Sequence, residues 1–224
     1  MTKVANIIDN FIGGEYQAPI NNNYLDNIEP ATGLVYGKTP NSDGIDVEQA
    51  VTAAERALPA WRALDIEQRA DYLTAIAQEI ENQLEPLALA EATDNGKPLA
   101  LARMVDIPRA ASNFKFFAHA CSQFASESHS IAGTAINYTL RQAVGIVGCI
   151  SPWNLPLYLF TWKIAPALAA GNCVIAKPSE ITPQTAAMLG TICQKVGLPK
   201  GVLNILHGTG AGVGSSICNH PKVK

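Results

Sequence analysis

The segment from Cys149 to Lys163, with the sequence CISPWNLPLYLFTWK, contains the residues best suited to chemistry. Its apolar start predicts a buried strand, Ser151 and Pro152 end that strand, and an apolar helix follows. Asn154 lies between the two elements and presents its amide beyond the end of the strand. An asparagine at this position can also cap the following helix through its side-chain oxygen. Asn154 is therefore either a donor to a ligand or a helix cap.

A second polar pair, Lys177 and Glu180, follows the apolar run from Cys173 to Ala176. If that run is a strand of a parallel sheet, the pair lies at the carboxyl edge, where open α/β sheets bind their ligands. A lysine there can donate to ribose hydroxyls, and a carboxylate can accept from an adenosine 2′-hydroxyl while repelling the extra phosphate of NADP. The pair favours NAD. The alternative is a surface lysine and glutamate that flank Pro178 and bind nothing.

Glycines at every second position, Gly208, Gly210, Gly212 and Gly214, form a turn between a predicted strand and a predicted helix. No register matches G-x-G-x-x-G, because larger residues occupy the place of the last glycine, so the Rossmann fingerprint is absent. A glycine-rich turn before a helix still lets the backbone approach a cofactor closely. The alternative is a tight turn that serves packing alone.

Composition excludes several classes of protein. The chain has 224 residues, of which 48% are hydrophobic and 16% charged, as expected for a globular protein with a sizeable core. The net charge of −3 provides no basic field for nucleic acid. The N-terminal segment carries polar and acidic residues where a signal peptide needs an apolar core, and no apolar stretch is long enough to span a bilayer. We expect a cytoplasmic protein without membrane or nucleic-acid partners.

The cysteines give no sign of a disulfide framework or of a zinc site. There are five of them, an odd number, and they are widely spread without a CxxC pair or a nearby histidine at ligand spacing. We expect reduced and mostly buried thiols, at the following positions: Cys121, Cys149, Cys173, Cys193 and Cys218.

The first half of the chain is predicted to contain short strands and then helices. Turn signals separate short apolar runs in the first forty or so residues. Asp46 can cap a helix from Val47 through Trp61, and apolar residues from Leu73 to Leu87 recur on one helical face. A third helix is expected from Leu99 to Phe124, with a bend at Pro108.

From Ala143 onward, strands and helices alternate. The predicted strands are 144–150, 173–176 and 202–206, and the predicted helices are 157–170 and 182–196, followed by the glycine-rich turn and a last helix. This order indicates an α/β fold with a parallel nucleotide-binding sheet and helices on both faces. Before it, Ile136 to Arg141 alternate as an amphipathic strand, with Gly133 as a turn, and form part of an arm. The chain end, HPKVK, indicates the approach to another strand, so the sheet looks unfinished.

At this point three motifs, ISPWN, GNCVIAKPSE and LNILHGTGAGVG, resemble the aldehyde dehydrogenase superfamily in order and spacing, as do the NIEPATG and DNGKP segments. Among its members, the run ISPWNLPLYLFTWKIAPALAAGN is most similar to the hydroxymuconic and aminomuconic semialdehyde dehydrogenases. The resemblance implies NAD-dependent oxidation of an aldehyde by a homo-oligomeric enzyme, and this chain matches the N-terminal part of such an enzyme. It divides the chain into residues 1–125 (N-terminal part of the NAD-binding domain), 126–143 (oligomerisation arm) and 144–224 (parallel NAD-binding sheet), without a catalytic domain.

The resemblance also implies a role for Asn154. In aldehyde oxidation a cysteine thiolate attacks the carbonyl, and the carbonyl oxygen gains negative charge before hydride leaves for the nicotinamide. An amide donor placed at that oxygen lowers the barrier by about 3 kcal/mol. Asn154 matches the oxyanion asparagine of the superfamily, and this context favours the donor over the helix cap. Residues implied to contact the cofactor are Ile150, Ser151, Trp153, Lys177, Glu180, Gly210 and Gly214.

Substrate contacts are implied at the helix after Asn154. Leu155, Tyr158 and Trp162 match positions that line the aldehyde tunnel, although such spacing normally marks a core face. Arg109 could pair with a substrate carboxylate through its planar guanidinium, against the alternatives of a solvated helix face or a structural ion pair. Asp106 and the backbone around Ile28 match a monovalent-cation site of the superfamily. A single carboxylate is weak evidence for such a site, so no metal is predicted.

The nucleophilic cysteine and the deprotonating glutamate of the superfamily are implied to lie beyond the position that matches Lys224. Cys149 is the cysteine nearest to Asn154 in sequence, but burial in an apolar strand raises a thiol pKa and leaves the thiol inert. We therefore expect these 224 residues alone to be inactive. One hypothesis takes the chain as part of an NAD-dependent aldehyde dehydrogenase acting on a carboxylated semialdehyde, or on betaine-type or aliphatic aldehydes. The other takes it as a noncatalytic nucleotide-binding or interaction module.

Overall fold

A five-stranded sheet forms the centre of the computed structural model, which describes residues 6–224. The strand order is β3-β2-β10-β9-β8. β9 runs parallel to β8 and to β10, as the alternation of elements predicts, whereas β2 pairs antiparallel with β10 and with β3. The bounds are Asn10–Ile12 (β2), Glu15–Gln17 (β3), Ile146–Ile150 (β8), Cys173–Lys177 (β9) and Leu203–Ile205 (β10).

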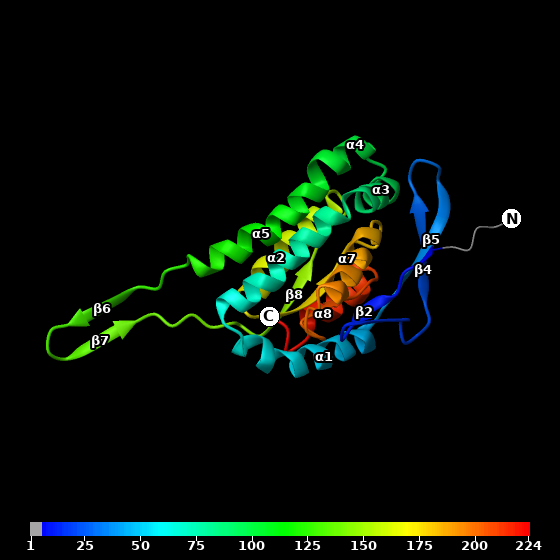
Figure 1. Cartoon of the computed structure of the whole chain (residues 1–224). Coiled ribbons are helices and arrows are strands. Elements are labelled where there is room, and N and C mark those ends of the chain that lie inside the picture. Colours follow the sequence, from blue (N-terminus) through cyan, green and yellow to red (C-terminus); the bar gives the residue numbers. More distant parts are fainter. Residues whose placement is uncertain (1–5) are drawn as a thin grey trace.

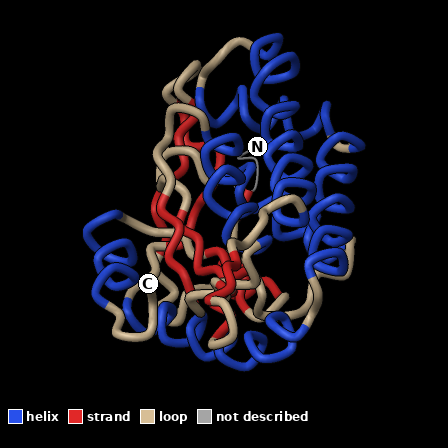
Figure 2. The backbone as a smooth tube through the Cα atoms, turned by 90° about the vertical axis from the view of Figure 1, so that its left-hand side faces the viewer, coloured by secondary structure: helices blue, strands red, loops and turns tan. Residues whose placement is uncertain are grey.

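Helices cover both faces of this sheet, which confirms the predicted α/β architecture (Figures 1 and 2). Helix α1 lies on one side, while α2, α5 and α6 pack together on the other (Figure 1). The helix bounds are Gly44–Ala63 (α1), Ile66–Asn82 (α2), Leu84–Asn95 (α3), Leu99–Leu101 (α4), Ile107–Ser122 (α5), Pro156–Ala169 (α6), Gln184–Lys195 (α7) and Ser215–Asn219 (α8). Two π-helical turns, η1 (Ala102–Asp106) and η2 (Gly210–Gly214), precede α5 and α8.

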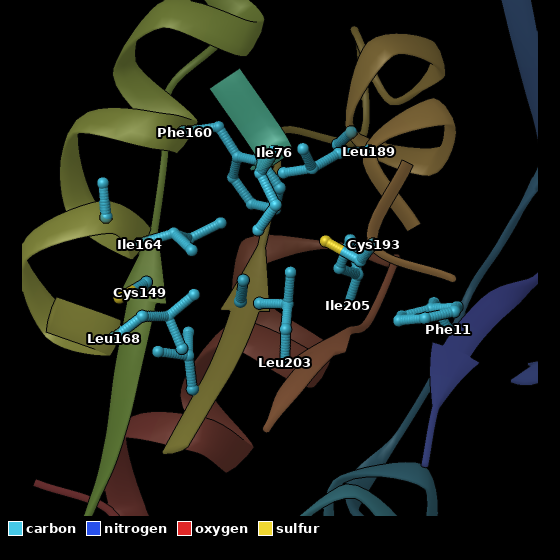
Figure 3. Close-up of a cluster of buried hydrophobic side chains, with 14 of the residues drawn as sticks. Phe11, Ile76, Cys149, Phe160, Ile164, Leu168, Leu189, Cys193, Leu203 and Ile205 are labelled. Atoms are coloured by element: carbon cyan, nitrogen blue, oxygen red, sulfur yellow. The ribbon is translucent and has the colours of Figure 1, made fainter. Parts of the chain in front are cut away.

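The core lies between the sheet and the helices that follow its strands. Phe160, Ile164 and Leu168 recur at helical spacing on α6 and point toward the sheet, where they are fully buried (Figure 3). Leu203 and Ile205 of β10 are buried in the same cluster. Burial of an apolar side chain of this size contributes about 1.5–3 kcal/mol, so this cluster fixes α6 against the sheet.

The start of α1 differs from the prediction. Asp43, and not Asp46, is the N-cap: its side chain accepts from the Ile45 N–H, at 2.8 Å. Asp46 is the third residue of the helix, and its carboxylate accepts from the Asp43 N–H at 3.1 Å, which completes a capping box. The two aspartates, three residues apart, thus both accept hydrogen bonds from backbone N–H groups at the N-terminus of α1.

The other two predicted helices are interrupted. The apolar face from Leu73 to Leu87 is shared by α2 and α3, because Gln83 leaves helical geometry with φ −103° and ψ 24°. Its N–H still donates to the Glu79 carbonyl, so the periodicity continues through the break. Around Pro108, η1 widens the helix just before α5 begins. Proline lacks an N–H and crowds the carbonyl four residues earlier, which the wider turn accommodates.

Two smaller sheets lie apart from the central one. β1 (Asn6–Ile7) and β4 (Tyr24–Glu29) flank β5 (Leu34–Pro40). β6 (Ser128–Ile131) and β7 (Ala135–Tyr138) form a hairpin around Gly133, whose φ is +69°, and extend away from the body (Figure 1). Every residue of the hairpin strands is exposed, so the alternation read as an amphipathic strand has no buried face within the described chain.

The last residues pair with the central sheet. Val223 forms a parallel bridge with Ile146, and the Gly148 N–H donates to the Lys224 carbonyl at 3.1 Å. The extended segment predicted from HPKVK therefore lies beside β8, at the edge opposite β9. No helix among residues 6–224 is both long enough and apolar enough to span a membrane.

Candidate functional site

Asn154 lies in the loop between β8 and α6 with its side chain exposed. It does not cap the helix: the N-cap position of α6 is Leu155, which makes no side-chain capping hydrogen bond. Within residues 6–224 the Asn154 amide has no hydrogen-bond partner. The structure thus leaves this donor free for a ligand, as required by the first of the two interpretations.

Lys177 and Glu180 meet at the carboxyl end of β9. The Lys177 side chain is buried, and its Nζ donates to the Pro178 carbonyl at 2.8 Å and to Glu180 Oε2 at 3.0 Å. Partial burial would raise the pKa of Glu180, but hydrogen bonds from backbone N–H groups and from Lys177, together with the Lys177 charge, outweigh burial and lower it. Lys177 and Glu180 are therefore not two solvated surface side chains. They form a salt bridge, in which hydrogen bonds orient the Lys177 donor and the Glu180 acceptor.

The glycine-rich turn lies against this pair. One of the backbone N–H groups that lower the pKa of Glu180 belongs to Gly210. A Cβ at Gly214 would lie 3.6 Å from Cδ of Lys177, while a Cβ at Gly210 would meet nothing within 4 Å. Thr209 caps the turn by accepting from the Gly212 N–H at 3.0 Å. Lys177, Glu180 and both glycines thus form one cluster with open space above Gly210.

The loop of Asn154 is joined to the same sheet edge. Ile150 pairs with Lys177 in the parallel register, and the Ser151 N–H donates to the Lys177 carbonyl at 3.0 Å. Ser151 is buried, whereas Ile150 and Trp153 are 38% and 55% exposed. Exposed apolar side chains beside a polar cluster can contact a ring or a ribose. The predicted cofactor residues therefore lie beyond the ends of three adjacent strands, β8, β9 and β10.

A third group lies along α5 and α6. The Arg109 guanidinium is 5.3 Å from the centroid of the Tyr158 ring, which is 5.1 Å from the Trp162 ring. Trp162 is 48% exposed, so this helix face is not a core face throughout. Within residues 6–224 Arg109 forms no salt bridge, which leaves its charge available. Leu155, half-buried, lies at the start of the same helix.

Asp106 and Ile28, which the resemblance matches to a monovalent-cation site, lie on η1 and β4. Asp106 is buried, and its Oδ2 lies 2.7 Å from Nζ of Lys97. The carboxylate that bonds to β4 is Asp94, which accepts from the Asn27 amide at 2.9 Å. The described residues contain no group of three or more His, Cys, Asp or Glu side chains that could hold a metal ion.

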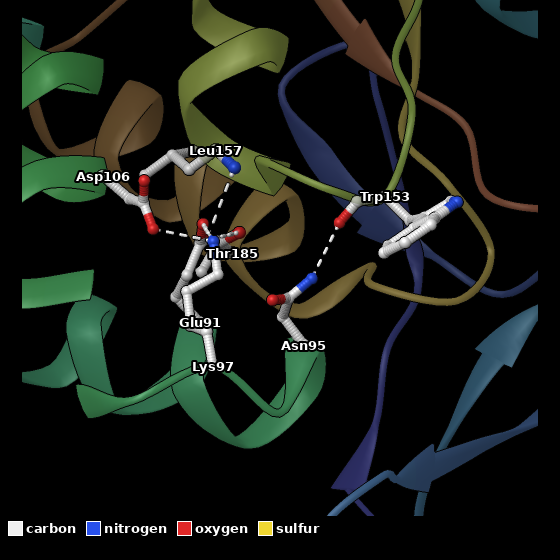
Figure 4. A network of polar contacts seen from close by, with 7 residues as sticks. All are labelled: Glu91, Asn95, Lys97, Asp106, Trp153, Leu157 and Thr185. Atoms are coloured by element: carbon white, nitrogen blue, oxygen red, sulfur yellow. Dashed lines mark hydrogen bonds and ion pairs between the residues drawn. The ribbon is translucent and has the colours of Figure 1, made fainter. Parts of the chain in front are cut away.

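The sequence did not predict the polar cluster of Glu91, Lys97, Asp106 and Thr185, nor the role of nearby Asn95 (Figure 4). Glu91 is fully buried and accepts from the Leu157 N–H of α6 and from the Thr185 hydroxyl. A signal was present. Leu87, Glu91 and Asp94 recur at helical spacing on α3, so two carboxylates occupy positions where apolar side chains are expected.

The cysteines match the expectation of mostly buried thiols. Cys149, Cys173 and Cys193 are buried, Cys121 is half-buried and Cys218 is exposed. Burial raises the pKa of Cys149 to about 11 against a small opposing effect of Lys163, and it raises those of Cys173 and Cys193 to about 12. Thiols with such pKa values are poor nucleophiles at neutral pH.

Comparison with known proteins identifies the family of the chain. The model of the aldehyde dehydrogenase family matches residues 17–224. This chain belongs to the aldehyde dehydrogenase family. The chain is 50% identical over 218 residues to 2-aminomuconic semialdehyde dehydrogenase of Mus musculus, and 41% identical over 222 residues to 2-hydroxymuconic semialdehyde dehydrogenase of Pseudomonas sp. (strain CF600). These matches cover 97% and 96% of the chain but 44% and 46% of the relatives, in their N-terminal part.

A solved structure of the family superposes closely. The NAD+ complex of aldehyde dehydrogenase from Bacillus cereus has a TM-score of 0.95 and 33% identity, and the match covers 97% of this chain and 45% of that one. The fold described above is thus the fold of the corresponding part of a family member. The chain spans less than half the length of the relatives that it matches.

Proposed function

We propose that this chain carries the oxyanion donor and much of the NAD site of an aldehyde dehydrogenase that oxidises an aldehyde to its acid. The observation that carries the proposal is the Asn154 amide, exposed and unbonded within the described chain, in a loop tied to Lys177 by the Ser151 hydrogen bond. A donor amide and a ribose-binding pair on adjacent strand ends suit a reaction between an aldehyde and a dinucleotide.

The residues of this cluster fit NAD. Lys177 can donate to ribose hydroxyls, and the ionised Glu180 can accept from the adenosine 2′-hydroxyl while it repels a 2′-phosphate. The open space at Gly210 lets a cofactor reach the backbone. When bound, NAD accepts the hydride that leaves the substrate carbon. The relatives' NAD+ complex supports this choice of cofactor.

Asn154 supports the chemistry at the substrate oxygen. When a thiolate of the complete active site attacks the aldehyde carbon, the carbonyl oxygen becomes negative, and the Asn154 amide donates to it. We infer that the thiolate is not one of the three buried cysteines, because their raised pKa values keep them protonated. The 224 residues by themselves are proposed to bind NAD without oxidising an aldehyde.

The substrate is proposed to be a carboxylated semialdehyde. The two semialdehyde dehydrogenases named above are similar to this chain, and Arg109, which forms no salt bridge among residues 6–224, lies beside Tyr158. A guanidinium fork suits a carboxylate, whereas betaine-type or aliphatic aldehydes have no carboxylate to bind it. We also propose that the β6–β7 hairpin pairs with another copy in a homo-oligomer, and that the enzyme acts in the cytoplasm.

The decisive experiment replaces Asn154 in the complete natural protein. Asn154→Ala should lower kcat/KM for the aldehyde about 10²–10³-fold and leave the dissociation constant of NAD unchanged. The same change at exposed Asn23, in the turn before β4, is the control and should have no effect. Equal kcat/KM in the Asn154→Ala variant and the unaltered protein would exclude Asn154 as the oxyanion donor, whereas no aldehyde oxidation by the unaltered protein would favour the noncatalytic module.

A further inference from the structure

The loop that carries Asn154 is held on both sides by residues of α3 and its C-terminal end. On the N-terminal side, the Asn95 amide donates to the Trp153 carbonyl at 2.9 Å (Figure 4). On the C-terminal side, the Leu157 N–H donates to Glu91 Oε2 at 3.3 Å. Asn154 therefore lies between two backbone groups that are fixed by the same helix.

The hydrogen bond to Glu91 replaces a local helix cap. The first N–H groups of a helix have no partner within the helix, and the N-cap of α6 provides none. Glu91, on another helix, supplies the acceptor instead. The beginning of α6, and with it the end of the Asn154 loop, is thus set by a tertiary contact.

Glu91 is in turn held by its neighbours. Its Oε1 lies 3.3 Å from Nζ of Lys97, which lies 2.7 Å from Asp106, and the Thr185 hydroxyl donates to Oε2 at 3.0 Å. The side chains of Glu91, Lys97 and Asp106 are 0%, 7% and 2% exposed. Burial of two carboxylates and one ammonium is costly, and replacing such a group by apolar residues is often neutral for stability. A role in positioning the start of α6 therefore explains this buried group of charged side chains better than a contribution to stability does.

We propose that Asn95 and Glu91 are positioning residues, which hold the Trp153 carbonyl and the Leu157 N–H so that the Asn154 amide faces the substrate oxygen. This inference rests on the proposed function. Neither residue contacts the substrate in it, and both act through Asn154. A displacement of about 1 Å at a reacting group can cost up to about a hundredfold in rate, so the loss of one anchor is expected to be measurable.

Asn95 provides the test, because it lies near the surface and its removal leaves the buried ion pairs intact. A double-mutant cycle in the complete natural protein combines Asn95→Ala with Asn154→Ala. The readout is the single-turnover rate of NAD reduction with saturating aldehyde, together with the dissociation constant of NAD and the melting temperature. Asn95→Asp, of equal size but without the donor, is a second variant, and Asn23→Ala is the control.

We expect Asn95→Ala to lower the single-turnover rate about tenfold with an unchanged NAD affinity and melting temperature, and Asn95→Asp to lower it at least as much. In the Asn154→Ala background, Asn95→Ala should change the rate less than about twofold, since its effect passes through Asn154. An equal loss in both backgrounds, or no loss in the unaltered background, would overturn the inference alone. A normal rate in Asn154→Ala itself would overturn the proposed function and this inference with it.

Discussion

The ammonium group of Lys177 lies 3.0 Å from the carboxylate of Glu180, at the carboxyl end of β9. The lysine side chain is 2% exposed and the glutamate side chain 33%, so the Glu180 carboxylate faces solvent and the Lys177 ammonium group lies beneath it. This asymmetry places the carboxylate where it meets a ligand first.

Glu180→Gln should relax the choice between NAD and NADP. The amide keeps an oxygen acceptor for a 2′-hydroxyl but no longer repels a 2′-phosphate, so the ratio of kcat/KM for NADP to that for NAD should rise about tenfold. Steady-state kinetics with each cofactor measures it. Glu67→Gln, an equal loss of charge on the exposed face of α2, is the control. An unchanged ratio would remove Glu180 from the 2′-hydroxyl site.

Gly214→Val should weaken NAD binding by displacing Lys177. A Cβ alone would lie at van der Waals distance, 3.6 Å, from the lysine Cδ, and the two further methyl groups of valine have to push the lysine aside. The dissociation constant of NAD, measured by calorimetry, should rise about tenfold. Gly214→Ala is the matched control and should stay within about twofold of the natural protein. If Gly214→Ala raises the dissociation constant of NAD as much as Gly214→Val does, the weaker binding results from close approach of the cofactor to the backbone and not from displacement of Lys177.

The cysteines should differ sharply in reactivity. At about pH 8, iodoacetamide should modify exposed Cys218 and spare Cys149, Cys173 and Cys193 until the protein is unfolded. Peptide mass spectrometry resolves the sites. Rapid modification of Cys149 in the folded protein would show that its thiol is available as a nucleophile.

The same thiols predict alkaline destabilisation. Their pKa values rise from 9.0 in isolation to about 11 for Cys149 and about 12 for Cys173 and Cys193, so above pH 9.0 the unfolded chain loses protons that the folded chain keeps. The free energy of unfolding should be unaffected by these groups below pH 9.0 and should fall as the pH rises toward their folded-state pKa values. Urea unfolding as a function of pH tests this. Cys173→Ala should reduce the slope.

Gly190→Ala should destabilise the junction between α7 and the β2–β3 edge. A Cβ at this buried position would lie 2.6 Å from the Tyr16 hydroxyl oxygen and 3.0 Å from the Phe11 ring. We expect a loss of about 1–3 kcal/mol in the free energy of unfolding by urea. Gly44→Ala, where the new Cβ would be 3.6 Å from Ser216 Oγ, should change it by less than about 1 kcal/mol.

Arg109→Ala should discriminate between substrates. The apparent affinity for a carboxylated semialdehyde should fall about tenfold, whereas that for an aliphatic aldehyde should stay the same. KM values for both aldehydes measure the difference. Lys115→Ala, which removes a charge from the same helix, is the control. An unaltered KM for the semialdehyde would exclude Arg109 from carboxylate binding.

Much of the fold could be predicted because local patterns and tertiary packing agree. The alternation after Ala143 predicts β8, α6, β9, α7 and β10 with bounds close to those observed, since each element buries one continuous apolar face. The antiparallel pairing of β2 with β10 could not be predicted in this way. It joins residues nearly two hundred positions apart, such as Phe11 and Ile205, and neither strand carries a local sign of its partner.

Residue types and their spacing establish which groups can act: the donor amide of Asn154, the charges of Lys177 and Glu180, and glycines where a backbone must approach a ligand. Tertiary structure decided how they are held. It left Asn154 unbonded within the described chain, set the Lys177 ammonium against Glu180, and fixed the Asn154 loop through Asn95 and Glu91 of α3. Residue type and spacing define a group's chemistry, whereas desolvation and long-range hydrogen bonds, which depend on distant parts of the chain, decide its charge and direction.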